Sequence, residues 1–344
     1  MEIKPLTKQD YDNWNQFCLD SDDTWWYNTT HWLEYTLNYK PENKPESKSF
    51  MILENNKIMA ICSLIKEKDE FSFGNDYGPT PAFNVDLTRK ERNKYMKAVF
   101  KHIDELAKDN NIKRIRMRFP VLNHGYDLYN YLTKFGFIDT SINTRLIDLS
   151  CDLEDLRREI RHGHDSDIDK ASRVLGAEIY DKENIGMDIF NKYKHLHFLA
   201  SGRQTRPDKT FELIYEWIKQ GNGFLIGALL DDEFVSFSYF TVYKNNVNYG
   251  SSCNKPNIDL PLAHLVQWVA IKYMSYLYDF YELGWQYYGN TLTDFPSKKE
   301  INISRFKRGF GGFTQPMFRG EKFYDKDYFL QVYSERIKKY SEFL

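Results

Sequence analysis

The feature that most constrains the fold is an order of predicted elements that occurs twice along the chain. In residues 1–150 a strand is followed by two helices, three strands, a long helix, a strand, a short helix and a final strand. The residue pattern from 177 to 319 predicts the same order again. An order of this length is difficult to repeat by chance, so the chain is expected to contain a duplicated domain.

The long helix of each half is the clearest element. Apolar residues at helical spacing run through Thr88–Asn110, and Asp259–Tyr276 occupies the corresponding place in the second half. A strand follows each helix, at Ile112–Phe119 and at Phe280–Gly284. Each half therefore combines strands joined by tight turns with a crossover from helix to strand, which is typical of a mixed sheet.

We predict an α/β (α+β) chain of two tandem domains, each a mixed, mostly antiparallel sheet flanked by helices. The N-terminal domain would span residues 1–150 and the C-terminal domain residues 151–344. A short helix is expected around Tyr126–Phe135. The second domain would begin with a charged linker helix at residues 152–175 and end with a trailing helix at Tyr324–Phe343.

Charge and hydropathy narrow the class of partner. Lys and Arg number 47 against 49 Asp and Glu, so the formal net charge is −2 and no global field attracts DNA or an anionic membrane. The N-terminus carries no apolar leader, and no stretch approaches the roughly 18 apolar residues of a spanning helix. We expect a cytoplasmic protein without a transmembrane segment, whose anionic ligands are held by local clusters.

One such cluster lies near the C-terminus. Residues 298–312 hold five Lys or Arg side chains and one Glu, with three glycines and two phenylalanines. Phe306 and Phe310 are four residues apart, so on a helix they share a face and would dock the segment. The glycines would end the helix and let backbone approach a ligand. We predict that this run binds an anion.

The duplicated order resembles the GCN5-related N-acyltransferase (GNAT) fold as it is duplicated in the Fem family of aminoacyl transferases, which extend peptidoglycan precursors. The residues that carry the resemblance are Tyr77-Gly78-Pro79, Tyr281-Glu282-Leu283-Gly284, the run from Phe306 to Gly312, and Arg319-Gly320-Glu321. The Phe-Lys and Phe-Gly run after a Glu-Leu-Gly strand is the most specific of these. The resemblance covers nearly the whole chain.

The resemblance implies acyl or aminoacyl transfer to a primary amine, with the family's lysine falling on Lys307 near the reacting carbonyl. A cation at that place would stabilise the oxyanion of the transition state. Arg305 and Arg308 are its expected supports. Glu282 would either accept the proton of the amine or orient Lys307 and Arg308. Trp285 follows the strand and is placed to line a pocket.

Two further groups of residues are candidates for substrate contact. Asp76 and Tyr77 stand at the end of the first meander and would contact the acceptor, although Asp76 before a Gly-Pro turn also suits plain turn chemistry. Arg203 and Arg206 lie in a loop between two predicted helices and could clamp a phosphate. In the family an arginine near here contacts the phosphates of a nucleotide-sugar acceptor, and the match could fall on either residue.

The lack of a glycine-rich loop before either long helix indicates which acyl donor the protein uses. Acyl-CoA users of this fold carry a glycine-rich loop before the long helix, and neither Tyr77–Asn84 nor Ser251–Leu260 reproduces it. We therefore expect no tightly bound cofactor and favour aminoacyl-tRNA over acyl-CoA as donor. Contact with tRNA would then be local, through Lys298, Lys299 and Arg305.

The stretch around His162 and His164 suggests a metal site at first, but side chains two apart diverge on a helix, so we predict no metal and a charged linker helix. The predicted function is acyl or aminoacyl transfer to a primary amine of a cell-envelope or surface-glycan precursor, either a nucleotide- or lipid-linked amino sugar or a peptide. One alternative is an acyl-CoA-dependent N-acyltransferase acting on a nucleotide-linked amino sugar, such as a nonulosonate-type sugar. The other is a catalytically silent binding scaffold with this fold.

Overall fold

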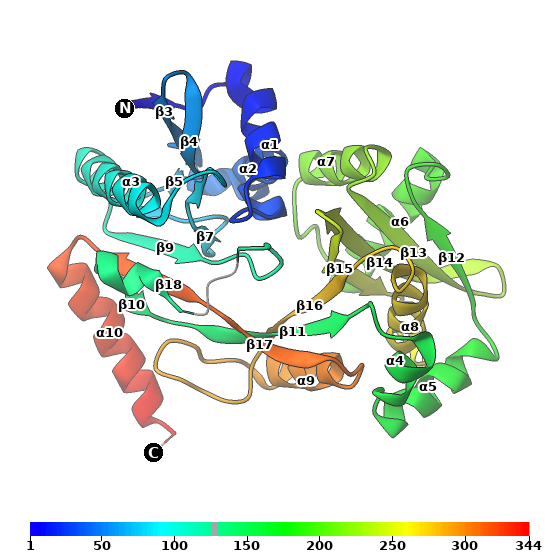
Figure 1. Ribbon diagram of the computed structural model, residues 1–344. Coiled ribbons are helices and arrows are strands. Elements are labelled where there is room, and N and C mark those ends of the chain that lie inside the picture. The colour runs from blue at the N-terminus through cyan, green and yellow to red at the C-terminus, as the bar shows by residue number, and fades with distance from the viewer. Residues whose placement is uncertain (126–128, 344) are drawn as a thin grey trace. The chain divides into compact units, whose positions relative to one another are not determined.

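A computed structural model describes residues 1–125 and 129–343 of the protein (Figure 1). Mixed sheets and the helices packed against them make up both halves of the chain, which confirms the predicted α/β class. The contacts divide the chain into two compact units, which are described separately below. Unit 1 consists of Met1–Ile142, Tyr287–Ser297 and Pro316–Leu344, and unit 2 consists of Asn143–Gln286 and Lys298–Gln315.

Unit 1 contains two sheets and the long helix α3. Its elements are β1 (Glu2–Pro5), α1 (Tyr11–Asp20), α2 (Thr30–Tyr39), β2 (Glu46–Ser47), β3 (Phe50–Glu54), β4 (Lys57–Cys62), β5 (Ile65–Glu67), β6 (Glu70–Phe71), β7 (Gly78–Pro79), β8 (Ala82–Phe83), α3 (Arg89–Asp109), β9 (Arg114–Arg118), β10 (Ile138–Asp139), β18 (Arg319–Phe323) and α10 (Lys326–Ser341), with short 3-10 helices at Lys8–Asp10, Trp26–Asn28, Pro41–Asn43 and Tyr131–Phe135. One sheet has the order β1-β3-β4-β8, and the other runs β10-β18-β9-β6-β5-β2 with β7 paired to β9.

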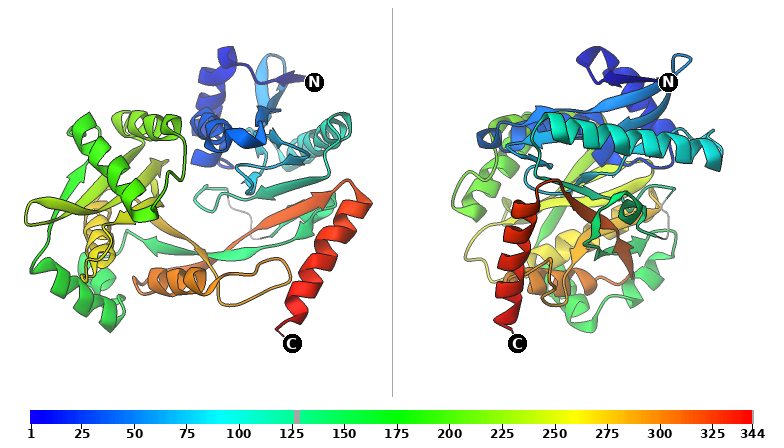
Figure 2. Two further views of the ribbon diagram at one scale, coloured as in Figure 1. Left: turned by 180° about the vertical axis from the view of Figure 1, so that it is seen from behind. Right: turned by 90° about the vertical axis from the view of Figure 1, so that its left-hand side faces the viewer.

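Helix α3, seen along its length in Figure 2, forms where the sequence predicts it. Thr88 caps it with Glu91 in a reciprocal capping box, which satisfies backbone donors at the start of the helix. Tyr95, Val99 and Ile103 on its inner face are buried in the core beneath β3, β4 and β9. The apolar spacing of this helix therefore decided which face is inside.

The short helix predicted at Tyr126–Phe135 is only partly described. Residues 126–128 lie outside the described residues, and a 3-10 helix occupies Tyr131–Phe135. Asn130 caps its start through its side-chain oxygen, which accepts from the backbone N–H of Leu132. Gly136 ends the helix with a φ of 81°, a conformation that glycine adopts without steric cost.

Unit 2 is built on a seven-stranded sheet with the order β12-β13-β14-β15-β16-β11-β17. Its elements are β11 (Ile142–Asp148), α4 (Leu153–Arg158), α5 (His162–Ser172), β12 (Gly176–Tyr180), α6 (Met187–Ser201), α7 (Asp208–Lys219), β13 (Gly223–Leu230), β14 (Glu233–Tyr243), β15 (Asn246–Asn254), α8 (Leu262–Met274), β16 (Phe280–Gln286), α9 (Lys298–Arg308) and β17 (Phe313–Met317). The strands β13, β14 and β15 form the predicted meander.

The pairing of β15 with β16 is short. The two strands are parallel and pair at three positions, of which Asn248 with Glu282 is the last. Beyond this pair β15 continues to Asn254 and β16 to Gln286 without a shared ladder. The ladder therefore ends beside Glu282, in the middle of the sheet.

The final strand predicted for each half is divided between the units. The final strand of the first half is β10 in unit 1 and β11 in unit 2, and at the end of the second half the chain leads from β17 into β18. β11 pairs with β16, whereas β18 returns to pair with β9. The compact units therefore differ from the predicted division after residue 150, because the remote pairing partner decides which unit a strand joins.

The linker predicted as one helix at 152–175 is two helices, α4 and α5, with a break at residues 159–161. The break is held by tertiary contacts, since the backbone N–H of Arg161 donates to the carbonyl of Gly309 at 2.9 Å. Helix α9 runs from Lys298 to Arg308 and ends at the glycines, as predicted for the run 298–312. The break between α4 and α5 therefore arises from a contact between segments that are far apart in the sequence.

Candidate active site

Lys307 is a buried cation in the last turn of α9. The residue is 6% exposed, and its Nζ lies 4.2 Å from the centre of the Trp285 ring. A Cβ on Gly284 would stand 3.1 Å from the same Nζ, so the glycine leaves the ammonium its space. Within residues 1–125 and 129–343 the ammonium has no ion pair and no hydrogen bond.

Burial lowers the pKa of Lys307 to about 8, because removal of water disfavours the charged form. The negative charge of Glu282 acts in the opposite direction and raises this pKa. The ammonium is therefore mostly protonated at neutral pH but can lose its proton close to that range. A buried lysine with these properties is a candidate for a role in chemistry.

Glu282 lies on β16 where the ladder with β15 ends. Its residue is 5% exposed, and its two carboxylate oxygens accept hydrogen bonds from Thr144 Oγ1 at 2.8 Å and from Asn248 Nδ2 at 3.0 Å. Neither Thr144 on β11 nor Asn248 on β15 was a predicted site residue. No local signal singles them out, since both stand in ordinary strand patterns. They come to Glu282 only through the order of strands in the sheet.

The C-terminal end of α9 is held by the segment that joins α4 to α5. The Nε2–H of His164 donates to the carbonyl of Phe306 at 2.9 Å, while Nδ1 accepts from Arg161 at 2.9 Å. Burial lowers the pKa of His164, which keeps the ring neutral as this pattern of donor and acceptor requires. Phe306 directly precedes Lys307, so His164 fixes the backbone that carries the lysine.

The glycines that follow Lys307 are needed for close packing. Gly311 and Gly312 have φ values of 82° and 76°, and a Cβ on Gly312 would stand 2.0 Å from the carbonyl oxygen of Leu146. The backbone N–H of Gly312 donates to the carboxylate of Glu159 at 2.8 Å. Phe310 is buried in the core of unit 2, as the spacing of the phenylalanines predicted. The run after Lys307 therefore serves to anchor the helix end.

The other cations of the run have separate positions. Arg308 is half-buried and donates from Nη1 to Gln286 Oε1 at 3.0 Å. Arg305 is exposed, and Lys298 and Lys299 are exposed at the start of α9. The structure therefore brings three of the predicted site residues of unit 2 together, namely Lys307, Trp285 and Glu282. The other cations of the run lie apart from this group or at its edge.

Arg203 and Arg206 lie between α6 and α7. Arg203 is exposed, whereas Arg206 is half-buried with its guanidinium 5.4 Å from the ring of Phe211. Arg206 Nη2 also lies 3.1 Å from His197 Nε2, and burial together with Arg206 lowers the pKa of that histidine to about 4. Arg206 therefore belongs to a local packing cluster, while Arg203 is the residue open to solvent.

Asp76 and Tyr77 belong to unit 1. Asp76 is exposed, and its carboxylate accepts from the backbone N–H of Tyr77 at 2.8 Å, which is turn chemistry. The hydroxyl of Tyr77 is 3.0 Å from Thr140 Oγ1, and the guanidinium of Arg319 lies 4.6 Å from the centre of its ring. Tyr77 is thus fixed between a hydroxyl and a cation.

A histidine pair stands close to an aspartate in unit 2. Donor atoms of His164, Asp167 and His264 lie within 4.8 Å of one another. Both ring nitrogens of His164 already have partners in Arg161 and the carbonyl of Phe306, and the guanidinium beside them opposes a cation. His162, the other histidine of the predicted pattern, is exposed and two residues away. The cluster serves the packing of α5 on α8.

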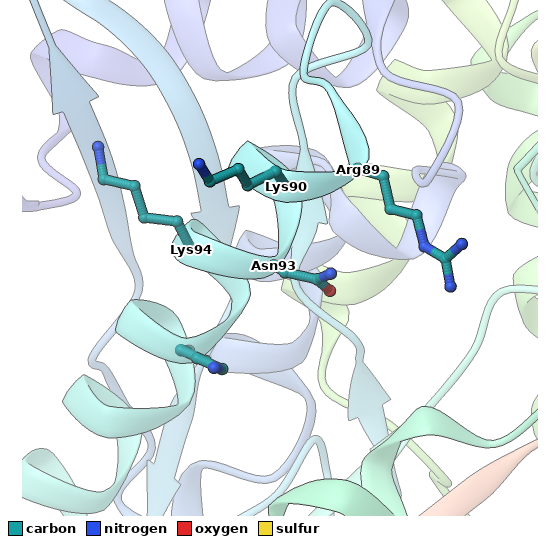
Figure 3. A pocket seen from close by; sticks show the side chains of 5 residues that line it. Arg89, Lys90, Asn93 and Lys94 are labelled. Carbon is teal, nitrogen blue, oxygen red and sulfur yellow. The ribbon is translucent and has the colours of Figure 1, made fainter.

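A second group of cations lies on the N-terminal turns of α3 in unit 1 (Figure 3). A shallow hollow there is lined by Arg89, Lys90, Asn93, Lys94 and Lys97. These positions share one face of the helix, and the labelled side chains project from it in the close-up. Lys94 is paired with Glu54 at 3.1 Å. This stripe was not among the predicted sites, because a basic helix face is ordinarily a solvated one.

The fold is shared with several solved structures. FemX matches with a TM-score of 0.66 at 15% identity, over 97% of this chain and 100% of FemX. L-PGS from Bacillus licheniformis matches with a TM-score of 0.62 at 10% identity, over 97% of each chain. A tandem GNAT protein from the clavulanic acid biosynthesis pathway matches with a TM-score of 0.53 at 11% identity, over 94% of this chain and 98% of that one. The predicted duplicated GNAT-like fold is confirmed.

Neither a protein-family model nor a curated protein sequence matches the chain. Among the helices of the described residues, none combines the length and the apolar content that crossing a membrane would take.

Proposed function

We propose that the protein transfers an acyl or aminoacyl group from an activated ester to a primary amine, with Lys307 beside the reacting carbonyl. One observation carries the proposal: Lys307 has a buried ammonium, with a pKa near 8, that no anion neutralises within the described part of the chain. Such a cation can stabilise a negative charge that develops only in the transition state of the reaction. The fold shared with FemX and L-PGS, and the resemblance to the Fem aminoacyl transferases, support this class of chemistry.

In the proposed reaction the amine nitrogen attacks the carbonyl carbon of the ester, and the carbonyl oxygen becomes negatively charged. Lys307 donates a hydrogen bond to this oxyanion. When the intermediate collapses, the carbon–oxygen bond of the ester breaks, the amine nitrogen loses a proton and the leaving oxygen gains one. With a pKa of about 8, Lys307 is mostly protonated at neutral pH, as its role requires.

Glu282 is assigned an orienting role in this scheme. Thr144 and Asn248 occupy its carboxylate oxygens, and its negative charge raises the pKa of Lys307. Its field therefore keeps the lysine protonated without forming an ion pair that would neutralise it. The ring of Trp285 lies against the lysine, and Arg308, the next residue along the chain, donates to Gln286.

The donor proposed is aminoacyl-tRNA rather than acyl-CoA. The segment between β15 and α8 contains no glycine, and Pro261, which lacks a backbone N–H, precedes the first residue of α8. Both properties reduce the number of amides that could wrap a pyrophosphate. The acceptor proposed is the amine of a nucleotide- or lipid-linked amino-sugar or peptide precursor of the cell envelope, with Arg203 the more accessible of the two candidate phosphate contacts.

The test of Lys307 compares Lys307→Met with Lys272→Gln, which removes an exposed cation from α8 of the same unit. Product formation is followed by mass spectrometry with a panel of amine acceptors. We expect Lys307→Met to lower the rate by about 10²–10³-fold, as loss of an oxyanion donor does, and Lys272→Gln to stay within about threefold of wild type. Transfer by Lys307→Met at the wild-type rate would remove the lysine from the mechanism.

A second experiment separates the donors. The wild-type protein is supplied with aminoacyl-tRNA or with acetyl-CoA, and its thermal transition is measured beside product formation. A donor at 100 times its Kd should add about 2.7 kcal/mol of stability. Turnover with acetyl-CoA alone would establish the CoA-dependent alternative, and binding without any product would establish the scaffold.

A further inference from the structure

Unit 1 presents a row of arginines on one face of a sheet, here called the arginine face. Its members are Arg114, Arg116 and Arg118 on β9 and Arg319 on β18. Strand residues alternate between faces, and Ile115 and Met117 point to the core, so the three arginines of β9 share the opposite side. β9 and β18 are antiparallel neighbours (Figure 1), and Arg118 stands directly opposite Arg319.

Most of this charge is neutralised inside the unit. Glu70 accepts from Arg114 at 2.8 Å and from Arg116 at 3.2 Å. Glu321 pairs with Arg114 at 3.4 Å and also with Arg336 of α10. The fourth arginine of the face, Arg319, pairs with Asp294.

Arg118 is the exception. It forms no ion pair or hydrogen bond through its side chain within the described residues, and its guanidinium lies 4.4 Å from the centre of the Tyr27 ring. Its Nε is buried without a partner, and so is the Nε of Arg116. Buried donors without partners are rare in folded proteins and point to a missing ligand or water. Like charges directly across a ladder, as at Arg118 and Arg319, also destabilise a sheet.

Charge and spacing indicate what is missing. Among the described residues, five arginines, the four of the face and Arg336, stand against the three carboxylates that pair with them, so a dianion would restore neutrality. Residues i and i+2 of a strand are about 7 Å apart, which lets Arg116 and Arg118 approach one tetrahedral oxyanion from two sides. The ring of Tyr27 lies against the Arg118 guanidinium, and a guanidinium stacked on a ring can still donate hydrogen bonds from its edge.

We propose that the arginine face binds the phosphoryl group of a ligand through Arg118, with Arg116 as the second contact. The site lies in unit 1 and uses none of the residues around Lys307. The proposal for this site is therefore independent of the proposed transfer reaction. Its test measures binding of a ligand and not turnover.

The test is a calorimetric titration with inorganic phosphate at constant ionic strength, using sodium chloride as the balancing salt. Arg118→Gln is compared with wild type and with Arg89→Gln, which removes the same charge from the exposed surface of α3 in the same unit. We expect Arg118→Gln to raise the Kd for phosphate at least tenfold and Arg89→Gln to leave it within about twofold. Phosphate affinity that is equal in wild type and Arg118→Gln, or undetectable in wild type, would overturn the proposal.

A second variant guards against a folding defect. Arg118→Lys keeps the charge but loses the planar fork, so we expect a Kd between those of wild type and Arg118→Gln. Circular dichroism of each variant checks that the fold is retained. If Arg118→Gln unfolds, Arg118→Lys carries the test, and wild-type affinity in that folded variant would overturn the role of the fork.

Two more ligands identify the chemistry. A nucleoside diphosphate that binds at least tenfold more tightly than phosphate, and loses that advantage in Arg118→Gln, would place the phosphoryl group in a nucleotide-linked ligand. Equal affinities would support a phosphorylated ligand without a nucleotide. Acetate that binds as tightly as phosphate would overturn the choice of a phosphoryl group, because a monoanion would then suffice.

Discussion

Two buried charge sites, the Glu321 network of unit 1 and the Lys307 site of unit 2, are built in opposite ways. In unit 1 the fully buried Glu321 joins Arg114 and Arg336, so that each charge has a counter-charge and the carboxylate ties α10 to β18. In unit 2 Lys307 is nearly as buried, yet among the described residues its ammonium has only the ring of Trp285 and the electrostatic field of Glu282. A paired cation holds elements together, whereas an unpaired one costs stability and remains available to a substrate.

The largest effect on stability is expected from breaking the paired network. Glu321→Gln leaves Arg114 and Arg336 without the carboxylate between them, and removal of one partner from a buried charge network costs about 3–5 kcal/mol. Urea unfolding measures this loss. Glu335→Gln on the exposed face of α10 serves as control and should change the free energy of unfolding by less than about 0.5 kcal/mol. A small loss in Glu321→Gln would show that the network is not structural.

The unpaired lysine is expected to behave in the opposite sense. The pKa of Lys307 falls from an ordinary value of 10.5 to about 8, and each pKa unit corresponds to about 1.4 kcal/mol, so the buried charge costs up to about 3 kcal/mol at pH 7. Lys307→Met removes this cost and should raise the free energy of unfolding while slowing transfer by about 10²–10³-fold. Destabilisation by Lys307→Met would mean that the charge is compensated, and the contrast between the units would disappear.

The same lysine predicts a dependence of stability on pH. Between about pH 8 and 10.5 the unfolded chain keeps a proton on this side chain that the folded chain has lost, so the free energy of unfolding should rise with pH in this window. Below about pH 8 the side chain is protonated in both the folded and the unfolded chain, so the full free-energy cost of the buried charge is present. The difference between wild type and Lys307→Met isolates this term, since the other titrating groups are common to both. A difference that stays constant from pH 7 to 10.5 would contradict the lowered pKa.

The smallest effect tests how the lysine is positioned. His164→Gln keeps a hydrogen-bond donor toward the carbonyl of Phe306, whereas His164→Ala removes it, and such a bond is worth about 0.5–1.5 kcal/mol. We expect His164→Ala to lower kcat about tenfold with KM little changed and His164→Gln to recover most of the rate. An equal fall in both variants would show that the ring, and not its hydrogen bond, is what matters.

Much of the local structure could be predicted from the residues themselves. The long helix that begins after Thr88, its apolar face and the meander of unit 2 follow from spacing and turn residues, and each formed where it was expected. The same holds for the docking of Phe310, which depends on a helical interval of four residues. Lys307 itself was found through resemblance, because no local pattern distinguishes a buried lysine from a surface one.

The environment of the site could not be predicted in this way. Thr144 and Asn248 reach Glu282 from strands that are neighbours of β16 only in the folded sheet. Arg118 faces Arg319 because β18 returns across 200 residues of chain to pair with β9. The break between α4 and α5 likewise depends on a hydrogen bond to Gly309. In each case the interaction joins residues that are far apart in the sequence. Residue spacing predicts contacts only within a helix or strand, so it could not predict these.

The class of fold, the duplicated order of its elements and the position of most helices and strands follow from the residues alone. These depend on side-chain periodicity and on turn and capping residues, which act within a few positions of each other. Three other features arise only when the chain folds: the pairing of strands that are remote in sequence, the burial of Lys307 without an ion-pair partner, and the lack of a counter-charge at Arg118, the last two within the described residues. Burial and charge pairing are properties of the assembled sheet, because they depend on which remote residues exclude water and which bring an opposite charge.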